Sequence, residues 1–280
     1  MAELSVQDVT ARSVRVRFVS GGTGAPLVLL HDYLAGRSEW DDVQGALAAR
    51  FRLVVPDFPG FGESEKPEVD RFPYDLDALT ESIVDVIAGS RLGRVHLGGH
   101  GLGALVAMNL ATRHGALVDR LLLVAPPLFG ARPLQIARIA AAPVVGPLLF
   151  KQLYGPGLFR RHFRDHVYGK AMAFPAARVE GFFERFNAPA AREAAYATLS
   201  AMLDTRAVEA SLGRIASPTL ILWGRDDRCA PVEGGRRLQR AIPRAKLELL
   251  DCAHSPAEER PADFARIATT FLAARGEKAA

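Results

Sequence analysis

The pattern that most constrains this chain is a regular alternation of short β-rich runs with amphipathic helical stretches. Val14, Val16 and Phe18 alternate with arginines, as in a half-buried strand, and residues 27–30 form a fully apolar run that is typical of a buried strand. Strands that alternate with helices predict a mainly parallel sheet covered by helices on both faces. The expected fold class is therefore α/β.

The strands that this pattern predicts are 13–20, 27–30, 52–56, 94–98, 120–125, 219–223 and 246–250. The predicted helices are 38–50, 76–88, 102–114, 232–241 and 262–273, with Ser38 as the expected cap of the first one. Between the fifth and sixth of these strands the chain shows no strand pattern and is rich in helix-compatible residues. We therefore expect a core made of residues 1–127 and 213–280, with a helical lid at 128–212.

The composition is that of a globular protein, with 49% hydrophobic and 24% charged residues in 280. The N-terminus has no basic region followed by an apolar core, and no apolar run reaches the ~18 residues that a membrane span needs. Cys229 and Cys252 do not make a disulfide framework, and both are expected to be small buried fillers. A cytoplasmic protein without a membrane partner is expected.

The basic charge of the chain is unevenly distributed. Residues 128–212 carry 11 Lys/Arg against 6 Asp/Glu, whereas the remainder carries 24 against 25. The densest basic cluster is 160–164, which we interpret as a solvated helix face; attraction of an anionic substrate or an acidic carrier surface is the alternative. No nucleic-acid-binding motif accompanies the cluster, so no nucleic-acid partner is expected.

One segment joins a predicted strand to a predicted helix through closely spaced glycines. Gly99 and Gly103 stand where the nucleophile elbow, Gly-x-Ser-x-Gly, has its two glycines, but the central residue is Gly101 instead of serine. The segment 57–64, rich in proline and glycine after a strand, is a turn signal with a scaffolding role.

Two further motifs follow the last two predicted strands. Asp226 and Asp227 come after an apolar strand and a glycine, and His254 follows the next strand, 27 residues after Asp227. The chain order is that of nucleophile, acid and base in hydrolases built on this kind of elbow. Asp227 is the candidate acid, Asp226 the fallback, and His254 the candidate base.

Together the four motifs resemble the α/β-hydrolases, in the lidded group that includes epoxide hydrolases, haloalkane dehalogenases, C–C bond hydrolases and many esterases. The resemblance covers nearly the whole chain except the lid. It implies a mostly parallel eight-stranded sheet flanked by helices, with the lid inserted between two core strands. It also implies an oxyanion hole made by the backbone N–H groups of Tyr33 and Leu102, and structural roles for His31 and His100.

Two positions depart from the family pattern. Gly101 supplies neither the hydroxyl nor the carboxylate of a nucleophile; loss of the serine in subtilisin costs ~10⁶ in kcat, or ~8 kcal/mol of barrier. Ester hydrolysis through a covalent intermediate is therefore excluded as the main route, and a water within reach of His254 is expected to fill the space. The second departure is Asp32, where the family usually has glycine. Either its carboxylate points to solvent from a left-handed turn, or it is a working acid, base or hydrogen-bond donor.

These observations favour an enzyme in which the His254–Asp227 pair acts as general base without a covalent nucleophile. The base would act on a bound water or on the substrate itself, as in a lyase, cyclase, isomerase or dehydratase. The alternatives are a conventional serine hydrolase disabled, naturally or by engineering, at Gly101, and a non-catalytic binder. Asp32 argues against the first alternative, because a disabled hydrolase needs only one change.

The ligand is expected to be a small molecule, and no cofactor or metal is expected, because no phosphate-binding loop, dinucleotide motif or metal-ligand spacing is present. Aromatic residues are frequent in the lid, where most should pack on the core and some should line a pocket for an apolar or aromatic substrate. They are Phe150, Tyr154, Phe159, Phe163, Tyr168, Phe174, Phe182, Phe183 and Phe186.

Overall fold

A single eight-stranded sheet runs through the computed structural model, which describes residues 3–129, 146 and 149–274. In spatial order the strands are β1 (Leu4–Ala11), β2 (Val14–Gly21), β4 (Phe51–Pro56), β3 (Ala25–Leu30), β5 (Val95–His100), β6 (Val118–Val124), β7 (Thr219–Gly224) and β8 (Ala245–Leu250). β1 and β2 pair antiparallel, and every pair from β4 to β8 is parallel. The expected mostly parallel eight-stranded sheet is confirmed.

Seven of the strands coincide with the predicted runs, whereas β1 carries no clear signal. It is the edge strand beside β2, and most of its side chains are exposed. Because few of its side chains are buried, this edge strand lacks a regular alternation of apolar and polar residues, and periodicity does not reveal it.

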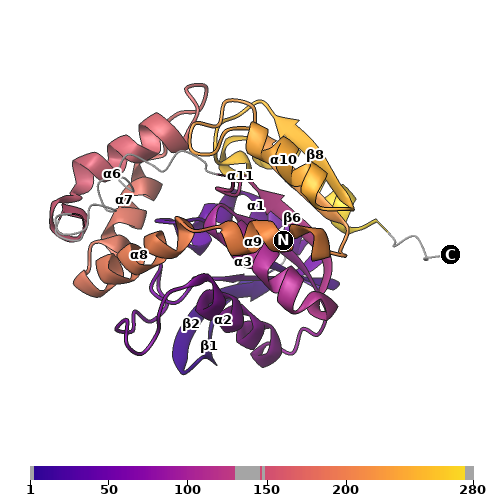
Figure 1. Cartoon of the computed structure of the whole chain (residues 1–280), viewed down its shortest axis with the longest axis horizontal. Helices are drawn as coiled ribbons and strands as arrows, with labels where there is room; N and C mark the ends of the chain where they lie inside the picture. Colours follow the sequence, from indigo (N-terminus) through magenta and orange to yellow (C-terminus); the bar gives the residue numbers. More distant parts are fainter. Residues whose placement is uncertain (1–2, 130–145, 147–148, 275–280) are drawn as a thin grey trace.

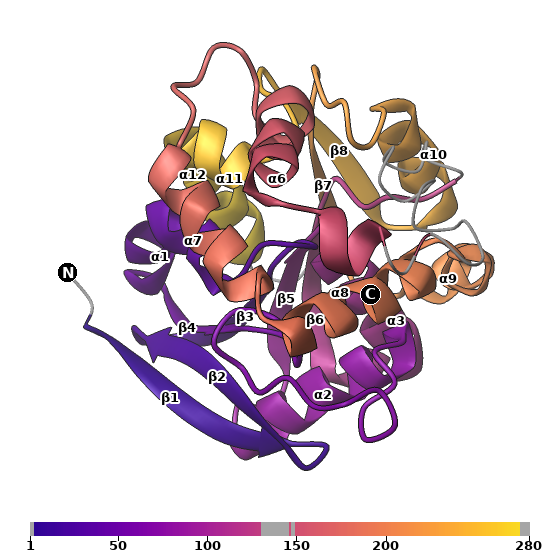
Figure 2. The same cartoon turned by 90° about the vertical axis from the view of Figure 1, so that its left-hand side faces the viewer.

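Helices cover both faces of the sheet (Figure 2). α1 (Asp41–Ala48) packs with α12 (Pro261–Leu272) and α11 (Pro256–Glu259), whereas α2 (Leu76–Gly89) packs with α3 (Leu102–Arg113). The short 3-10 turn η2 (Gly115–Leu117) follows α3, and α10 (Glu233–Ala241) lies against β7 and β8. The expected cap at Ser38 is wrong, because Ser38 lies inside the 3-10 turn η1 (Arg37–Trp40) that precedes α1.

A helical lid is inserted between β6 and β7, and Figure 1 shows α6, α7 and α8 standing to one side of the sheet. Its described elements are η3 (Leu149–Leu153), α6 (Pro156–His162), η4 (Phe163–Val167), α7 (Ala176–Phe186), α8 (Pro189–Met202), α9 (Arg206–Ser211) and η5 (Leu212–Arg214). Phe150, Tyr154, Phe159 and Phe186 pack on one another, with ring centroids 5.4 to 6.0 Å apart. Most lid aromatics thus form the interior of the lid itself.

No helix within the described ranges is long and apolar enough to cross a membrane.

Candidate active site

The predicted site residues come together at the carboxyl ends of the parallel strands. Asp32 follows β3, Gly101 follows β5, Asp227 follows β7 and His254 follows β8. Ligands of open α/β sheets bind along this edge, because the loops that leave neighbouring strands converge there. Four segments that are far apart in the sequence therefore form one site.

The backbone of the elbow keeps the strained turn of a nucleophile position. Gly101 has φ 49° and ψ −110° between the end of β5 and the first turn of α3. A Cβ on Gly99 would lie 2.2 Å from the carbonyl oxygen of Gly103, so the strand and the helix can approach this closely only without a side chain. Position 101 thus lies in a strained turn between strand and helix, of the kind that displays a nucleophile in many hydrolases, and here it carries no side chain.

The carboxylate of Asp32 fills the space that a side chain at position 101 would take. A Cβ built on Gly101 would lie 1.7 Å from Oδ1 of Asp32. Oδ1 accepts the backbone N–H of Leu102 at 2.7 Å, and Oδ2 lies 3.2 Å from Nε2 of His254. The expectation that a water fills this space is therefore wrong.

The orientation of Asp32 excludes one of the two interpretations of that residue, a carboxylate that points to solvent from a left-handed turn. Its side chain is only 17% exposed, and the left-handed backbone conformation in this loop belongs to Leu34 (φ 62°). The carboxylate points into the site rather than to solvent. Because the N–H of Leu102 is donated to Asp32, this expected oxyanion-hole donor already has a partner. The other expected donor is the backbone N–H of Tyr33. The phenol of the same residue donates to the carbonyl of Ala195 in the lid at 2.8 Å and is a separate contact.

Both ring nitrogens of His254 contact a carboxylate, Asp227 at Nδ1 and Asp32 at Nε2. Its Nδ1 lies 2.7 Å from Oδ2 of Asp227, whose Oδ1 accepts the N–H groups of Cys229 and Ala230 at 2.8 Å each. Asp226 is exposed, and its backbone N–H donates to the carbonyl of Cys252 at 3.0 Å. Of the two candidate acids, Asp227 is thus the one that contacts His254.

Asp227, His254 and Asp32 form a line of contacts, and their charges influence the pKa values of one another. Burial alone would lower the pKa of His254, but the carboxylates of Asp227 and Asp32 raise it well above its ordinary value. Burial would likewise raise the pKa of Asp32, but the hydrogen bond from His254 and the charges of His100 and His254 hold it well below its ordinary range. Both shifts favour a charged imidazole ring on His254 and a charged carboxylate on Asp32.

A second histidine–carboxylate pair lies next to the first, and sequence reasoning missed it. Nδ1 of His100 is hydrogen-bonded to Oε1 of Glu39, and Oε2 of Glu39 accepts the backbone N–H of Asp32 at 2.8 Å. The rings of His100 and His254 are 4.7 Å apart between centroids. Because Glu39 lies 61 residues before His100, no local motif could indicate the pair.

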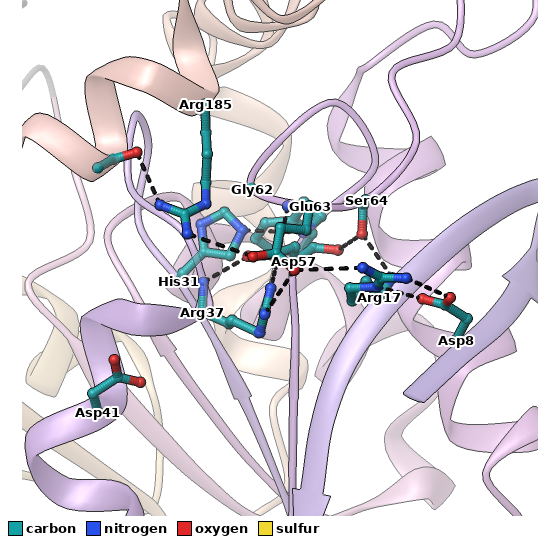
Figure 3. A network of polar contacts seen from close by, with 12 residues as sticks. Asp8, Arg17, His31, Arg37, Asp41, Asp57, Gly62, Glu63, Ser64 and Arg185 are labelled. Atoms are coloured by element: carbon teal, nitrogen blue, oxygen red, sulfur yellow. Dashed lines mark hydrogen bonds and ion pairs between the residues drawn. The ribbon is translucent and has the colours of Figure 1, made fainter. Parts of the chain in front are cut away.

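The loop that carries Asp32 is anchored to the loop after β4. His31 donates its Nδ1–H to the carbonyl of Asp32 at 2.8 Å and accepts the N–H of Phe58 on Nε2 at 3.0 Å, which defines a neutral tautomer. Next to it, the Asp57 carboxylate pairs with Arg37 (Figure 3). These contacts support the structural role expected of His31.

A cavity of about 250 Å³ opens above the site. We call Asp32, His100 and His254 the pocket floor, and His162, Phe163, Val167 and Phe182 of the lid the pocket roof; all seven line the cavity. Phe163 and Phe182 are thus lid aromatics that face the pocket. Burial lowers the pKa of His162 to about 4, so its ring is neutral. The roof is uncharged, whereas the floor is ionised.

Three side chains of the floor are also of the kinds that bind metals. Asp32, His100 and His254 each place one potential ligand atom within 4.8 Å of the others, and so do Asp227, Cys229 and His254. Both cysteines are free, and burial raises the pKa of Cys229 to about 12, so it is a thiol rather than a thiolate. These ligands come from separate loops and so have no recognisable spacing in the sequence.

The basic cluster 160–164 is partly neutralised within the lid. Arg160 pairs with Glu180, and Arg161 lies 3.2 Å from Asp165. The charge of Arg164 lies over the ring of Phe174. These contacts agree with the interpretation of the cluster as an exposed helix face.

Comparison with known proteins agrees with this architecture. Residues 27–267 match the alpha/beta hydrolase family. An uncharacterised protein of Mycobacterium tuberculosis is 29% identical, with 97% of this chain and 82% of that protein covered. The 2-hydroxymuconate semialdehyde hydrolase of Pseudomonas sp. is 27% identical (95% and 93% covered), and the 2-hydroxy-6-oxo-6-phenylhexa-2,4-dienoate hydrolase of Comamonas testosteroni is 25% identical (98% and 96%).

Solved structures show the same fold. The 2-hydroxy-6-oxo-6-phenylhexa-2,4-dienoate hydrolase of a Rhodococcus species superposes with a TM-score of 0.85 at 23% identity, over 98% of this chain and all of that one. The match over residues 27–267 spans most of the sequence and includes both the elbow and the His254 loop. The chain therefore belongs to the alpha/beta hydrolase family.

Proposed function

We propose that this chain is a small-molecule enzyme in which Asp32, His254 and Asp227 transfer protons and no covalent bond forms at position 101. One observation carries the proposal: the Asp32 carboxylate occupies the place of the missing nucleophile side chain and lies 3.2 Å from His254. In this contact at the bottom of a pocket, the carboxylate can act as a general base and the imidazolium as a general acid.

The protonation states of Asp32 and His254 indicate which residue donates a proton and which accepts one. With its pKa raised, His254 begins as the acid and gives a proton to one atom of the substrate, while Asp32 accepts a proton from another. The low pKa of Asp32 depends on the charge of His254, so Asp32 becomes a stronger base as His254 releases its proton. His254 is then the base of the return step, oriented by Asp227.

Two kinds of reaction fit this exchange. If Asp32 takes its proton from a bound water while His254 protonates the leaving group, the result is non-covalent hydrolysis. If both protons move on the substrate, the result is an isomerisation, elimination or cyclisation. The space at Gly101 is filled by Asp32 instead of water, which favours the second kind.

The pocket supports a small, apolar or aromatic substrate. Its roof contributes Phe163, Val167 and Phe182, and its volume of about 250 Å³ holds a molecule of a few rings at most. Two relatives are named as hydrolases of a phenyl-substituted hexadienoate and of 2-hydroxymuconate semialdehyde, which agrees with a compound of this size and character.

A four-variant comparison distinguishes this proposal from a disabled serine hydrolase. Hydrolysis of p-nitrophenyl esters is measured for the chain itself, Gly101→Ser, Asp32→Gly and the double variant. We expect only the double variant to gain activity, because in Gly101→Ser the Asp32 carboxylate collides with the new side chain and stays beside the oxyanion hole. A gain of several decades in Gly101→Ser alone would instead identify a disabled esterase.

A second measurement distinguishes the enzyme from a binder. The chain is incubated in D₂O with a panel of small aromatic and alicyclic compounds, and mass spectrometry records products and deuterium incorporation. We expect turnover or exchange that disappears in His254→Ala. Compounds that bind without any chemical change would favour the non-catalytic alternative.

A further inference from the structure

One polar atom of the pocket floor has no partner. Within the described part of the chain, Nε2 of His100 has no hydrogen-bond partner and is itself buried, while the side chain, only 3% exposed, lines the cavity. A buried polar atom without a partner costs roughly 1–3 kcal/mol, so such an atom in a pocket wall is usually satisfied by what binds there.

The surroundings of His100 prepare this nitrogen to donate. The carboxylate of Glu39 is hydrogen-bonded to Nδ1 of His100, so that Nε2 is the ring nitrogen available to a ligand. Asp227 orients His254 in the same way. Burial would lower the pKa of His100, but the charge of Glu39 and its hydrogen bond raise it, and Asp32 adds to this effect. The raised pKa favours the form with a proton on Nε2. His254 faces the same ring and opposes the added charge.

One of the two backbone donors expected of an oxyanion hole at this site is engaged elsewhere. The backbone N–H of Leu102, at the start of α3, is donated to Asp32. A substrate oxygen that gains negative charge during the reaction therefore lacks one of its two expected donors, and a further donor would stabilise it. His100 lies on the same pocket floor, next to Asp32 and His254, and offers one.

We propose that His100, oriented by Glu39, takes the place of the Leu102 donor in the oxyanion hole and binds the oxygen of an enolisable carbonyl substrate through Nε2–H. The inference rests on the proposed function. Asp32 removes a proton from the carbon next to the carbonyl, the C–H electron pair forms a C=C bond, and the carbonyl π pair moves to oxygen. The resulting enolate oxygen accepts the hydrogen bond from His100.

The step is completed without any external reagent. The enolate collapses and its carbon takes a proton back from Asp32, or a more distant atom of the conjugated system takes one from His254. The first outcome is exchange with solvent and the second is isomerisation, and neither changes the oxidation state of the substrate as a whole. The catalytic residues that touch the substrate are Asp32, His100 and His254, and Glu39 is a positioning residue.

Phenols of the same shape but graded acidity test the oxygen site without requiring turnover, because an ionised phenol resembles an enolate. Their dissociation constants are measured for the chain, His100→Gln, Glu39→Gln and Asp32→Asn. His96→Gln is the matched control, because His96 is also buried and lies on β5 but does not line the pocket. Thermal melts check that each variant is folded.

We expect His100→Gln to weaken p-nitrophenol binding by about 10- to 100-fold, as for loss of a hydrogen bond to a charged group, and to leave unsubstituted phenol within about threefold. Glu39→Gln should weaken p-nitrophenol less, Asp32→Asn should tighten it by removing a negative charge, and His96→Gln should have no effect. Equal affinities in the chain and His100→Gln would overturn the proposal. Binding that EDTA abolishes and Zn²⁺ restores would also overturn it, in favour of a metal at Asp32, His100 and His254.

Deuterium exchange into the α-carbon of small ketones separates this inference from the proposed function. If the phenol series behaves as expected but no compound is turned over, the oxygen site stands and the proposed function fails. If turnover occurs and depends on Asp32 and His254 but is unchanged in His100→Gln, the proposed function stands and the role of His100 fails.

Discussion

The floor and the roof of the pocket are built from opposite kinds of interaction. The floor places Asp32, His100 and His254 in contact with Leu102, Glu39 and Asp227, so each charge is oriented before any ligand arrives. The roof consists of aromatic and aliphatic side chains around the neutral ring of His162. Preorganised charges stabilise a transition state, whereas an apolar surface recognises shape and excludes water. The comparison predicts large effects on reaction rate from the floor and smaller effects on binding from the roof.

The largest effect is expected from the acid that orients His254. Asp227→Asn should lower the rate of deuterium exchange by roughly 10²- to 10⁴-fold, because the amide cannot hold the imidazolium in the same state. Asp226→Asn is the matched control and should leave the rate nearly unchanged, since Asp226 is exposed. Equal losses in the two variants would show that the floor does not depend on Asp227 in this way.

Glu258 lies where the lid meets the core, so it tests how the roof is attached. It accepts hydrogen bonds from Tyr168 and Ser255 and contacts Arg178, and burial raises its pKa from 4.5 to about 7. The native state therefore keeps a proton that the unfolded chain loses above pH 4.5. The free energy of unfolding should fall as the pH rises from 4.5 to 7, by about 3 kcal/mol in total.

Urea unfolding at several pH values measures this slope. Glu258→Gln should remove that part of the pH dependence, because the amide does not titrate, whereas Glu259→Gln on the same helix should retain it. An identical slope in Glu258→Gln and the original chain would show that another group is responsible.

A smaller effect is expected from the roof. His162→Phe should change the apparent affinity for aromatic ligands by about tenfold or less, with kcat nearly unchanged, because the neutral ring contributes surface rather than charge to the pocket. Steady-state kinetics on any exchanged ketone separates the two parameters. A large fall in kcat with KM unchanged would mean that the roof takes part in proton transfer.

The smallest effect on stability is expected from an exposed ion pair between lid and core. Arg178 contacts Asp42 of α1 at 2.7 Å, and the Asp42 side chain is 37% exposed. Asp42→Asn should lower the free energy of unfolding by less than about 1 kcal/mol, because water screens such pairs. A loss much larger than this, measured by urea unfolding, would show that this pair rather than the apolar packing attaches the roof.

Prediction from sequence succeeded where a residue's context is local. The glycines around position 101 and the order of Asp227 and His254 are readable because each follows a strand-like run, and the strands follow from their apolar patterns. The strand β1 was not predicted, because most of its side chains are exposed. The prediction of Ser38 as a helix cap was wrong, because a 3-10 turn that contains Ser38 precedes the helix. His100 could be matched only to a framework position, since its partner Glu39 belongs to another loop.

The sequence by itself determined the alternation of strands and helices, the glycine at position 101 between strand and helix, and the choice of Asp227 and His254 as partners, because these depend on short-range patterns. Only the tertiary structure decided what occupies the vacant position and which nitrogen of the site lacks a partner. Those facts depend on side chains from loops that meet at the end of a parallel sheet. There, less than 3 Å separates the Asp32 carboxylate from the atom that a side chain at position 101 would add.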